Sequence, residues 1–239
     1  RTRPGITWRG VPLLLLALVI FLWVAWEGQR LIRADFTSLG ARKQVGAWIS
    51  GESPLPTDAE WAEARDAIAA ALAITPDNPA LQEQMGDLHA VAGRRLWADG
   101  VARTPHFQRA EASYRQALAL RPGDPQTWAS LAMAYHGQGQ TGAPLHQAWA
   151  RALALGPNEG HVQPMLLETA LATWATASPA MQRWVLAFFD ASAPAQRKAI
   201  NDMAKRYGLQ LQADDDNAAK PTAGASTATS CASSAAPTR

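Results

Sequence analysis

The residues most able to do chemistry in this sequence are five histidines and one cysteine. A zinc site on a helix needs two histidines four residues apart, joined by further histidine, cysteine or carboxylate ligands. No two of these histidines have that spacing, and no cysteine or carboxylate cluster completes a ligand set. They are His89, His106, His136, His146 and His161, together with Cys231. A single thiol forms no internal disulfide, and one ligand does not make a metal site. We therefore expect neither a metal site nor a bound cofactor.

The sequence also lacks the signatures of an enzyme. It has no nucleophile elbow, Walker loop or dinucleotide fingerprint. The glycine-containing segment 137–140 follows no strand, so it is interpreted as a turn between helices. Asp58 and Glu60 belong to the capping box Thr57-Asp58-Ala59-Glu60, where negative charge stabilises a helix start. The sequence therefore predicts a protein that is not an enzyme and has no small-molecule substrate.

A basic cluster lies in the segment 93–106, which is expected to be an irregular insertion between two helices. It consists of Arg94, Arg95 and Arg103. These side chains could face lipid headgroups or an acidic partner, or form an ordinary solvated loop. The whole chain has a formal net charge of only +2, which does not favour a nucleic-acid partner.

A short motif occurs three times and indicates the architecture. It is Ala71-Leu72-Ala73-Ile74-Thr75-Pro76, then Ala117-Leu118-Ala119-Leu120-Arg121-Pro122, then Ala152-Leu153-Ala154-Leu155-Gly156-Pro157. Each copy ends a helical segment on a proline, where a helix must stop. The period, from Ala71 to Ala117 to Ala152, is typical of stacked helical hairpins.

The residues around these motifs resemble the tetratricopeptide repeat family. The segment 125–157 matches through Trp128, Leu131, Ala132 and Tyr135, then Leu145, Trp149, Ala152 and Pro157. An earlier unit carries Gln82, Met85, Gly86 and His89, then Ala110, Tyr114, Ala117 and Pro122, and a partial first unit carries Ala64, Ile68, Ala71 and Pro76. The resemblance implies an all-α solenoid over residues 57–176. Small residues would lie where helices approach closely, and Trp128, Tyr135, Tyr114 and Trp149 would fill the space between hairpins.

In this family, partners commonly bind in a concave groove lined by the first helix of each repeat. Mapped onto this chain, the groove positions are Glu83, Asp87, Gln126, Ala129, Met133 and His136. The alternative is that these are ordinary solvated helix residues. Glu83 and Asp87 would repel a carboxylate and favour a basic or neutral protein segment. His89 takes the position of an inter-helix tyrosine and is expected to be a packed core residue.

An uncharged apolar run from Val11 to Trp26 precedes the repeats. Counted from Trp8, and thus across Arg9, the stretch approaches the length of about 20 residues that a transmembrane helix needs, and tryptophans lie at both ends. We expect an uncleaved anchor, while a cleaved signal peptide and a buried core helix are the alternatives. A short basic head carrying Arg1, Arg3 and Arg9 favours a cytoplasmic N-terminus, although basic residues also follow the run.

The expected organisation is a basic head (1–10), a transmembrane anchor (11–29), a juxtamembrane helix and linker (30–56), the repeats (57–176), two capping helices (177–212) and a disordered tail (213–239). Beyond the juxtamembrane segment, helices are predicted near 57–74, 79–92, 107–120, 125–138, 143–155, 159–176, 179–190 and 193–207.

The function expected from this layout is a single-pass scaffold or adaptor of the bacterial envelope. The anchor would lie in the inner membrane, and the repeats, on the periplasmic side, would bind a protein partner that assembles or regulates an envelope complex. Pilus, polysaccharide and cytochrome-maturation systems use similar layouts. The alternative is an accessory structural subunit of a larger membrane enzyme complex.

Overall fold

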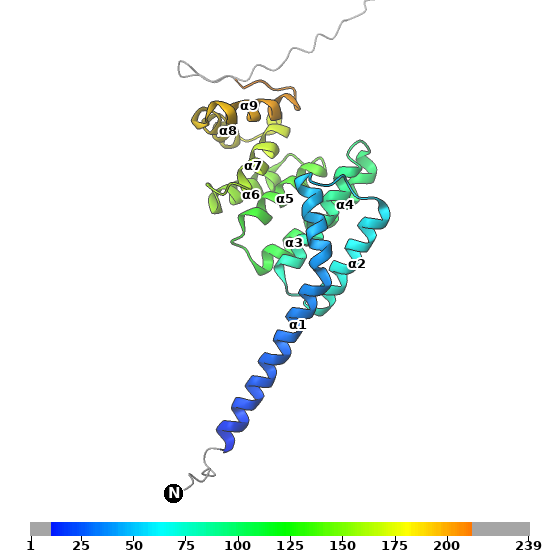
Figure 1. Cartoon of the computed structure of the whole chain (residues 1–239). Helices are drawn as coiled ribbons and strands as arrows, with labels where there is room; N and C mark the ends of the chain where they lie inside the picture. Colours follow the sequence, from blue (N-terminus) through cyan, green and yellow to red (C-terminus); the bar gives the residue numbers. More distant parts are fainter. Residues whose placement is uncertain (1–10, 212–239) are drawn as a thin grey trace, which may run out of the picture. The chain divides into compact units, whose positions relative to one another are not determined.

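The structure, a computed structural model, describes residues 11–211, and within this range it contains helices and no strands (Figure 1). The predicted head (1–10) and tail (213–239) lie outside the described residues. The helices are α1 (Val11–Ser50), α2 (Asp58–Ile74), α3 (Pro79–Arg95), α4 (Gly100–Leu120), α5 (Pro125–Gly137), α6 (Ala143–Leu155), α7 (Val162–Ala172), the 3₁₀ helix η2 (Trp174–Thr176), α8 (Pro179–Ala191) and α9 (Pro194–Lys205). The chain divides into two compact units, residues 1–166 and 167–239.

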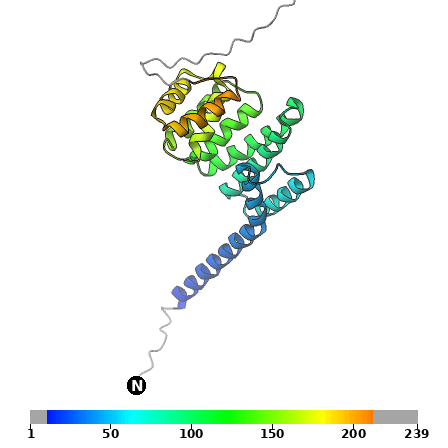
Figure 2. The same cartoon turned by 45° about the horizontal axis from the view of Figure 1, so that its top comes forward.

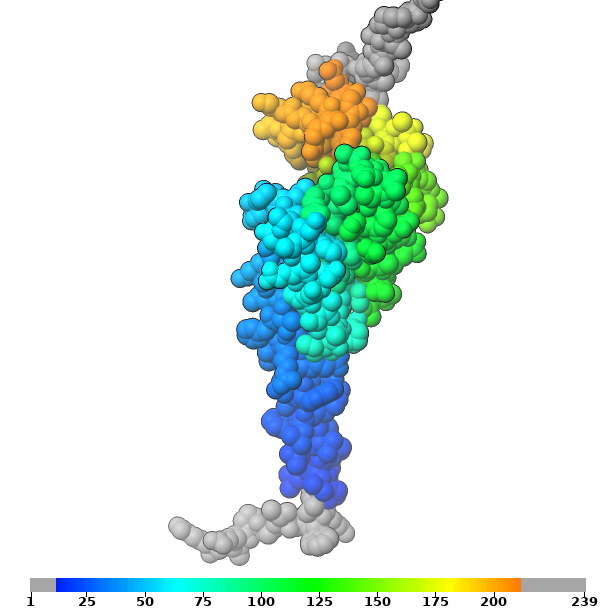
Figure 3. Space-filling view, turned by 90° about the vertical axis from the view of Figure 1, so that its right-hand side faces the viewer, coloured from blue at the N-terminus to red at the C-terminus, as the bar shows by residue number. Residues whose placement is uncertain are grey.

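Helix α1 continues without a break from the apolar run into the folded part of the first unit (Figures 1 and 2). Of the helices in the described range, it is the one long and apolar enough to cross a membrane. Its most apolar stretch is entirely exposed, which is the opposite of what a buried core helix requires. On the face shown in Figure 3, no other described segment covers this half of the helix.

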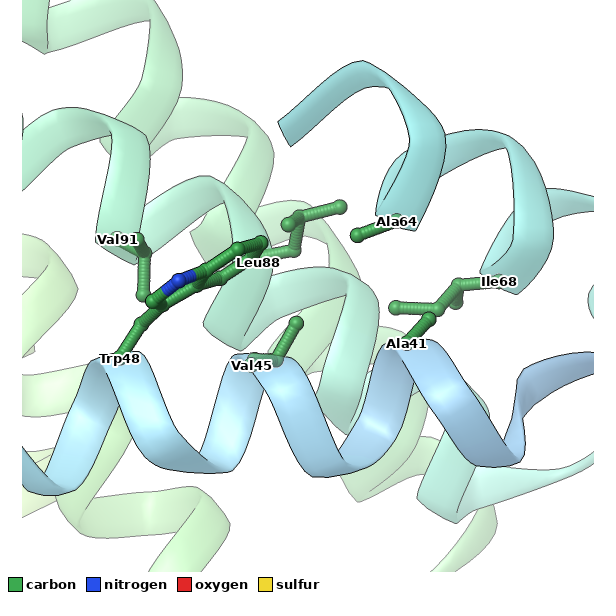
Figure 4. Packing of buried hydrophobic residues seen from close by; sticks show 7 residues of the cluster. All are labelled: Ala41, Val45, Trp48, Ala64, Ile68, Leu88 and Val91. Atoms are coloured by element: carbon green, nitrogen blue, oxygen red, sulfur yellow. The ribbon is translucent and has the colours of Figure 1, made fainter. Parts of the chain in front are cut away.

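The second half of α1 packs against α2 and α3 through one face. Ala41, Val45 and Trp48 recur at helical spacing along it and are buried. Figure 4 shows them meeting Ala64 and Ile68 of α2 and Leu88 and Val91 of α3. This apolar cluster joins the first helix to the next two and fixes the direction in which the exposed half of α1 leaves the unit.

Consecutive helices of the first unit pack in pairs, α1 with α2, α3 with α4, and α5 with α6. Each pair also contacts the next one, through α2 with α3 and α4 with α5. The first helices of the pairs touch as well, α1 with α3 and α3 with α5. A helical hairpin cannot bury its apolar face alone, and stacking on the neighbouring hairpins supplies the missing partner.

The three sequence motifs form three nearly identical turns. The residues before the prolines, Thr75, Arg121 and Gly156, have φ values of −131°, −138° and −137°. Their amides donate to the carbonyls of Ala71, Ala117 and Ala152, respectively. Six residues after each proline a side chain donates to the proline carbonyl, from Gln82, Trp128 and Gln163 at 3.1, 2.9 and 3.0 Å. The repeat in sequence is therefore also a repeat in backbone conformation and hydrogen bonding.

The expectation of an irregular insertion over 93–106 is wrong. Helix α3 runs to Arg95 and α4 begins at Gly100, so only a short turn separates them. Gly93 does not break its helix but makes room for a ring, since a Cβ there would lie 2.6 Å from Cε2 of Phe107. The Asp99 side chain caps α4 by accepting from the amides of Val101 and Ala102.

Trp149 and Tyr114 are buried, as predicted, but Tyr114 packs within the α3–α4 hairpin and not between hairpins. Trp128 is only half-buried, because its indole reaches back to the carbonyl of Pro122 at the turn instead of entering the core. Gly86 marks a close approach, since a Cβ there would lie 2.5 Å from Cε1 of Tyr114. Helix α3 can approach α4 this closely only without a side chain at that position.

The second unit contains α8 and α9, each with proline in its first turn. Its buried side chains include Met181, Val185, Phe189 and Ile200. Tyr207, after α9, donates to Glu168 of α7 at 3.2 Å. The two helices expected after residue 177 are thus confirmed with nearly the predicted bounds.

Candidate functional site

A polar cavity of about 390 Å³ lies where α1, α3 and α5, the first helices of the three hairpins, come together. It is lined by Arg42, Ala80, Glu83, Gln84, Asp87, Arg121, Asp124 and Gln126. All but one of these residues are polar, and three are acidic. We call this set the groove cavity.

One edge of the groove cavity is held rigidly by the turn before α5. Asp124 caps this helix, accepting from the Gln126 amide at 3.1 Å and from the Thr127 hydroxyl at 2.9 Å. The guanidinium of Arg121 bonds both Asp124 and Glu83, the latter at 3.1 Å. The Asp124 carboxylate is therefore largely satisfied by the fold itself.

Glu83 is placed where its charge is poorly tolerated. Its side chain is 12% exposed. Burial raises its pKa to about 7, and the neighbouring carboxylates of Asp87 and Asp124 add to the effect, while Arg121 opposes it. A cationic ligand would favour the charged form of this carboxyl group.

Asp87 is the acidic residue of the groove cavity that has no ion pair among the described residues. Its Oδ1 accepts a hydrogen bond of 2.8 Å from the hydroxyl of Tyr114. Burial raises the pKa of Asp87 to about 6, against the lowering effects of that hydrogen bond and of the Arg94 charge. The same environment raises the pKa of Tyr114 well above its ordinary value, so the phenol remains a donor.

The remaining polar groups leave the groove cavity with more acceptors than donors. Arg42 is engaged by Asp35 at 2.6 Å, and Arg121 by two carboxylates. The buried Oε1 of Gln84 has no hydrogen-bond partner in the described part of the chain. A cavity with spare carboxylate and amide oxygens fits a cationic donor, such as a lysine, an arginine or a terminal amine.

The structure brings together only some of the predicted groove residues. Glu83, Asp87 and Gln126 line the groove cavity. Ala129 is fully buried, so its place in the groove is wrong. Met133 is half-buried and does not line the cavity. His136 is not at the cavity either, because its ring lies 5.4 Å from that of Trp97, close to the turn between α3 and α4.

Five lining residues were missed by sequence reasoning, namely Arg42, Ala80, Gln84, Arg121 and Asp124. Arg42 lies on α1, which matches the family pattern poorly. Arg121 and Asp124 belong to the turn between hairpins and not to a first helix. A usable signal did exist for Asp124, since an acidic residue before proline at a helix start is a typical N-cap.

The basic cluster is not a loop. Arg94 and Arg95 lie in the last turn of α3, and Arg103 lies in the first turns of α4. Arg95 donates to the carbonyl of Pro56 at 2.9 Å and pairs with Asp58. Arg103 donates to the carbonyl of Trp97 at 2.9 Å and lies 4.5 Å from the centre of its ring. Two of the three arginines therefore hold the fold together at this end of the hairpins.

His89 is a packed core residue, as predicted. Its ring contacts those of Trp61 and His106, with centres 5.6 and 6.1 Å apart. Burial lowers the pKa of His89 to about 4, and the charges of His106, Arg109 and Arg65 act in the same direction. In residues 11–211, no group of three or more histidine, cysteine or acidic side chains is arranged to hold a metal ion.

Comparison with known proteins adds no assignment: no protein-family model matches the chain, and no curated protein sequence matches it. The function is therefore inferred from the groove cavity and the exposed helix.

Proposed function

We propose that this protein is a membrane-anchored scaffold of the tetratricopeptide type that binds a basic segment of a protein partner in the groove cavity. The observation that carries this proposal is the cavity between the three first helices, in which Glu83 is largely buried and Asp87 forms no ion pair with other described residues. A lysine or arginine from a partner would supply the missing positive charge. Because the carboxylates are already fixed by Arg121 and Tyr114, little ordering of the site is needed on binding.

The exposed half of α1 serves as the anchor in this proposal. Tethering raises the local concentration of the repeats near the bilayer, so that modest affinity for a membrane-bound partner suffices. The proposed location is the inner membrane of a bacterial envelope, with the basic N-terminus in the cytoplasm and the repeats in the periplasm. The proposed role, assembly or regulation of an envelope complex, rests on the family resemblance.

The test of this proposal is partner capture with isosteric variants. Charge reversal at the acids would leave a buried lysine facing Arg121 or Tyr114 and would perturb the fold, so Glu83→Gln with Asp87→Asn is preferred. The matched control is Glu63→Gln with Asp66→Asn, which removes the same charge from the exposed surface of α2. The full-length protein is crosslinked in its native membrane and purified, and the partners are identified by mass spectrometry.

A specific partner retained by wild type and control but lost by the groove variant supports the proposal. A partner captured equally by all three proteins would place the binding surface elsewhere, and absence of any specific partner would remove the basis for a scaffold.

A further inference from the structure

The first unit leaves one apolar helix face without a partner in the described part of the chain. On α1, beyond the apolar run, Ile32, Phe36 and Leu39 are 57%, 76% and 40% exposed. Their spacing of four and three residues puts them on one face, which we call the outer strip. The opposite face of the same turns carries Ala34 and Ser38, which are buried. The outer strip thus points away from α2 and α3.

Ion pairing leaves the neighbourhood of the outer strip positively charged. The two acidic residues of this stretch, Glu27 and Asp35, are paired with Arg30 and Arg42 at 3.3 and 2.6 Å, and Asp77, in the turn between α2 and α3, also pairs with Arg30 at 3.4 Å. Arg33 and Lys43 are exposed and form no ion pair with other described residues. Arg33 precedes Phe36 by less than one helical turn, and Lys43 follows Leu39 by about one turn. A surface that is apolar in the middle and cationic on both sides is complementary to anionic lipid headgroups.

The length of the apolar run brings the outer strip close to the bilayer surface. The sixteen residues from Val11 to Trp26 extend roughly 24 Å at 1.5 Å per residue, against about 30 Å of hydrocarbon. Arg9 ends the apolar run on its N-terminal side. The remaining thickness of the hydrocarbon must therefore be spanned by the residues that follow Trp26, up to Arg30. The guanidinium of Arg30 lies 5.9 Å from the ring centre of Trp26. Such a pair of an aromatic and a cationic side chain is suited to the interface between membrane and water. The strip begins two residues later, at the level of the headgroups.

We propose that the outer strip lies against the anionic headgroup layer of the same bilayer that holds the anchor. Phe36 and its neighbours then continue the lipid-facing surface of α1, and Arg33, three residues after Arg30, binds lipid phosphates. Contact along this face tilts α1 and holds α2 and α3 on the side away from the lipid. The inference rests on the proposed membrane anchor and adds a docking surface outside the transmembrane span.

Nitroxide accessibility tests this placement in the full chain. With Cys231 changed to serine, single labels are introduced through Phe36→Cys, Leu22→Cys in the span and Gln44→Cys on the exposed helix beyond the strip. Each protein is reconstituted into vesicles of phosphatidylcholine with phosphatidylglycerol. Collisions with oxygen, which concentrates in lipid, are compared with collisions with a water-soluble nickel complex. The expected result is that Phe36 resembles Leu22 in favouring oxygen, while Gln44 favours nickel.

The alternative outcomes separate the inference from the anchor on which it rests. A lipid-facing Leu22 with a water-exposed Phe36 overturns the docking surface and leaves the anchor intact. Low accessibility of Phe36 to both reagents means that protein covers the strip, which also overturns the inference. A water-exposed Leu22 overturns the anchor and the docking surface together.

A charge variant tests the headgroup contact directly. Replacing Arg33 by glutamine should shift the Phe36 label towards the nickel reagent on mixed vesicles, to the position it takes on pure phosphatidylcholine. The matched control replaces Arg183, an exposed residue of the second unit, by glutamine and should cause no shift. An equal shift in both variants would mean that net charge, and not this surface, governs the contact.

Discussion

The Tyr114 hydroxyl on α4 donates a hydrogen bond of 2.8 Å to Oδ1 of Asp87 on α3. The ring of this tyrosine fills the space that Gly86 leaves open inside the same hairpin. A core side chain thus positions a carboxylate of the groove cavity, so that packing within the hairpin and charge in the groove depend on each other.

Removing this hydroxyl by Tyr114→Phe should lower both stability and partner binding. A hydrogen bond to a charged group contributes roughly 1.5–3 kcal/mol, and the phenylalanine leaves Asp87 without its donor. Because that donor favours the charged carboxylate, its loss should raise the pKa of Asp87 further. Thermal unfolding and partner capture measure the two effects. The control Tyr135→Phe removes a hydroxyl that accepts from Arg115 away from the cavity and should not change capture. Equal loss of capture in both variants would contradict the assignment of Asp87.

Gly86→Ala should destabilise the first unit through overpacking. The new Cβ would lie 2.5 Å from Cε1 of Tyr114, and forcing an extra carbon into a packed core costs about 1–3 kcal/mol. Gly46→Ala on α1 is the matched control, since its Cβ meets nothing within 4 Å. That change should be neutral or stabilising, because glycine inside a helix costs roughly 0.5–1 kcal/mol relative to alanine. Denaturant unfolding of the full chain in detergent distinguishes the two, and an unaffected Gly86→Ala protein would refute the close approach of α3 and α4.

Two tryptophan substitutions should differ in cost although both residues match the family pattern. Trp149 is 2% exposed, so Trp149→Ala should lose roughly 3–5 kcal/mol. Trp128 is half-buried at a turn, and Trp128→Ala should cost clearly less. Thermal unfolding of the two variants shows directly which substitution is the more destabilising. If Trp128→Ala proved the more damaging change, the core assigned to the hairpins would be wrong.

The pKa of Glu83 predicts a specific pH dependence of stability. Its folded-state pKa of about 7 lies above the ordinary value of 4.5, so the folded chain retains a proton that the unfolded chain releases in this window. Stability from this group is therefore lost as pH rises from about 4.5 to 7 and stays lower above it.

Glu83→Gln should remove this loss, so its unfolding midpoint should rise relative to wild type between pH 4.5 and 7. Comparing variant with wild type cancels the opposite effect of His89, whose lowered pKa removes stability as pH falls from 6.5 towards 4. Glu63→Gln controls for a general charge effect. A constant difference across the pH range would contradict the burial of the Glu83 carboxyl.

Many of the helix boundaries could be predicted from the sequence because nearby glycine and proline residues determine where the helices end. The bounds of α6 follow from Gly142, from Pro144 in its first turn and from the Gly156-Pro157 stop, and they agree with the expected range. The insertion was mispredicted because Gly93 and Pro105 are ordinarily helix breakers. Gly93 instead accommodates the ring of Phe107 from the following helix α4, a contact that depends on how the two helices pack and that no rule for a single helix contains.

The residues of the candidate site could be predicted only where their spacing along a single helix places them. Glu83 and Asp87 follow from their spacing along α3, whereas Arg42 and Arg121 reach the cavity from another hairpin and from a turn. Ala129 was misplaced because its face of α5 turns into the core, a rotation that depends on packing against α4 and α6. Positions set by the stacking of hairpins require the three-dimensional structure.

Site-specific photocrosslinking tests the central claim, that the groove cavity holds a protein partner. A photoreactive amino acid replaces Gln126, which lines the cavity, or Gln116, which is exposed on α4, in the full chain in its native membrane. We expect one specific crosslinked partner from Gln126, none from Gln116, and loss of the Gln126 product when Glu83→Gln and Asp87→Asn are added. The same products from both positions, or a Gln126 product that survives removal of the two carboxylates, would contradict this claim.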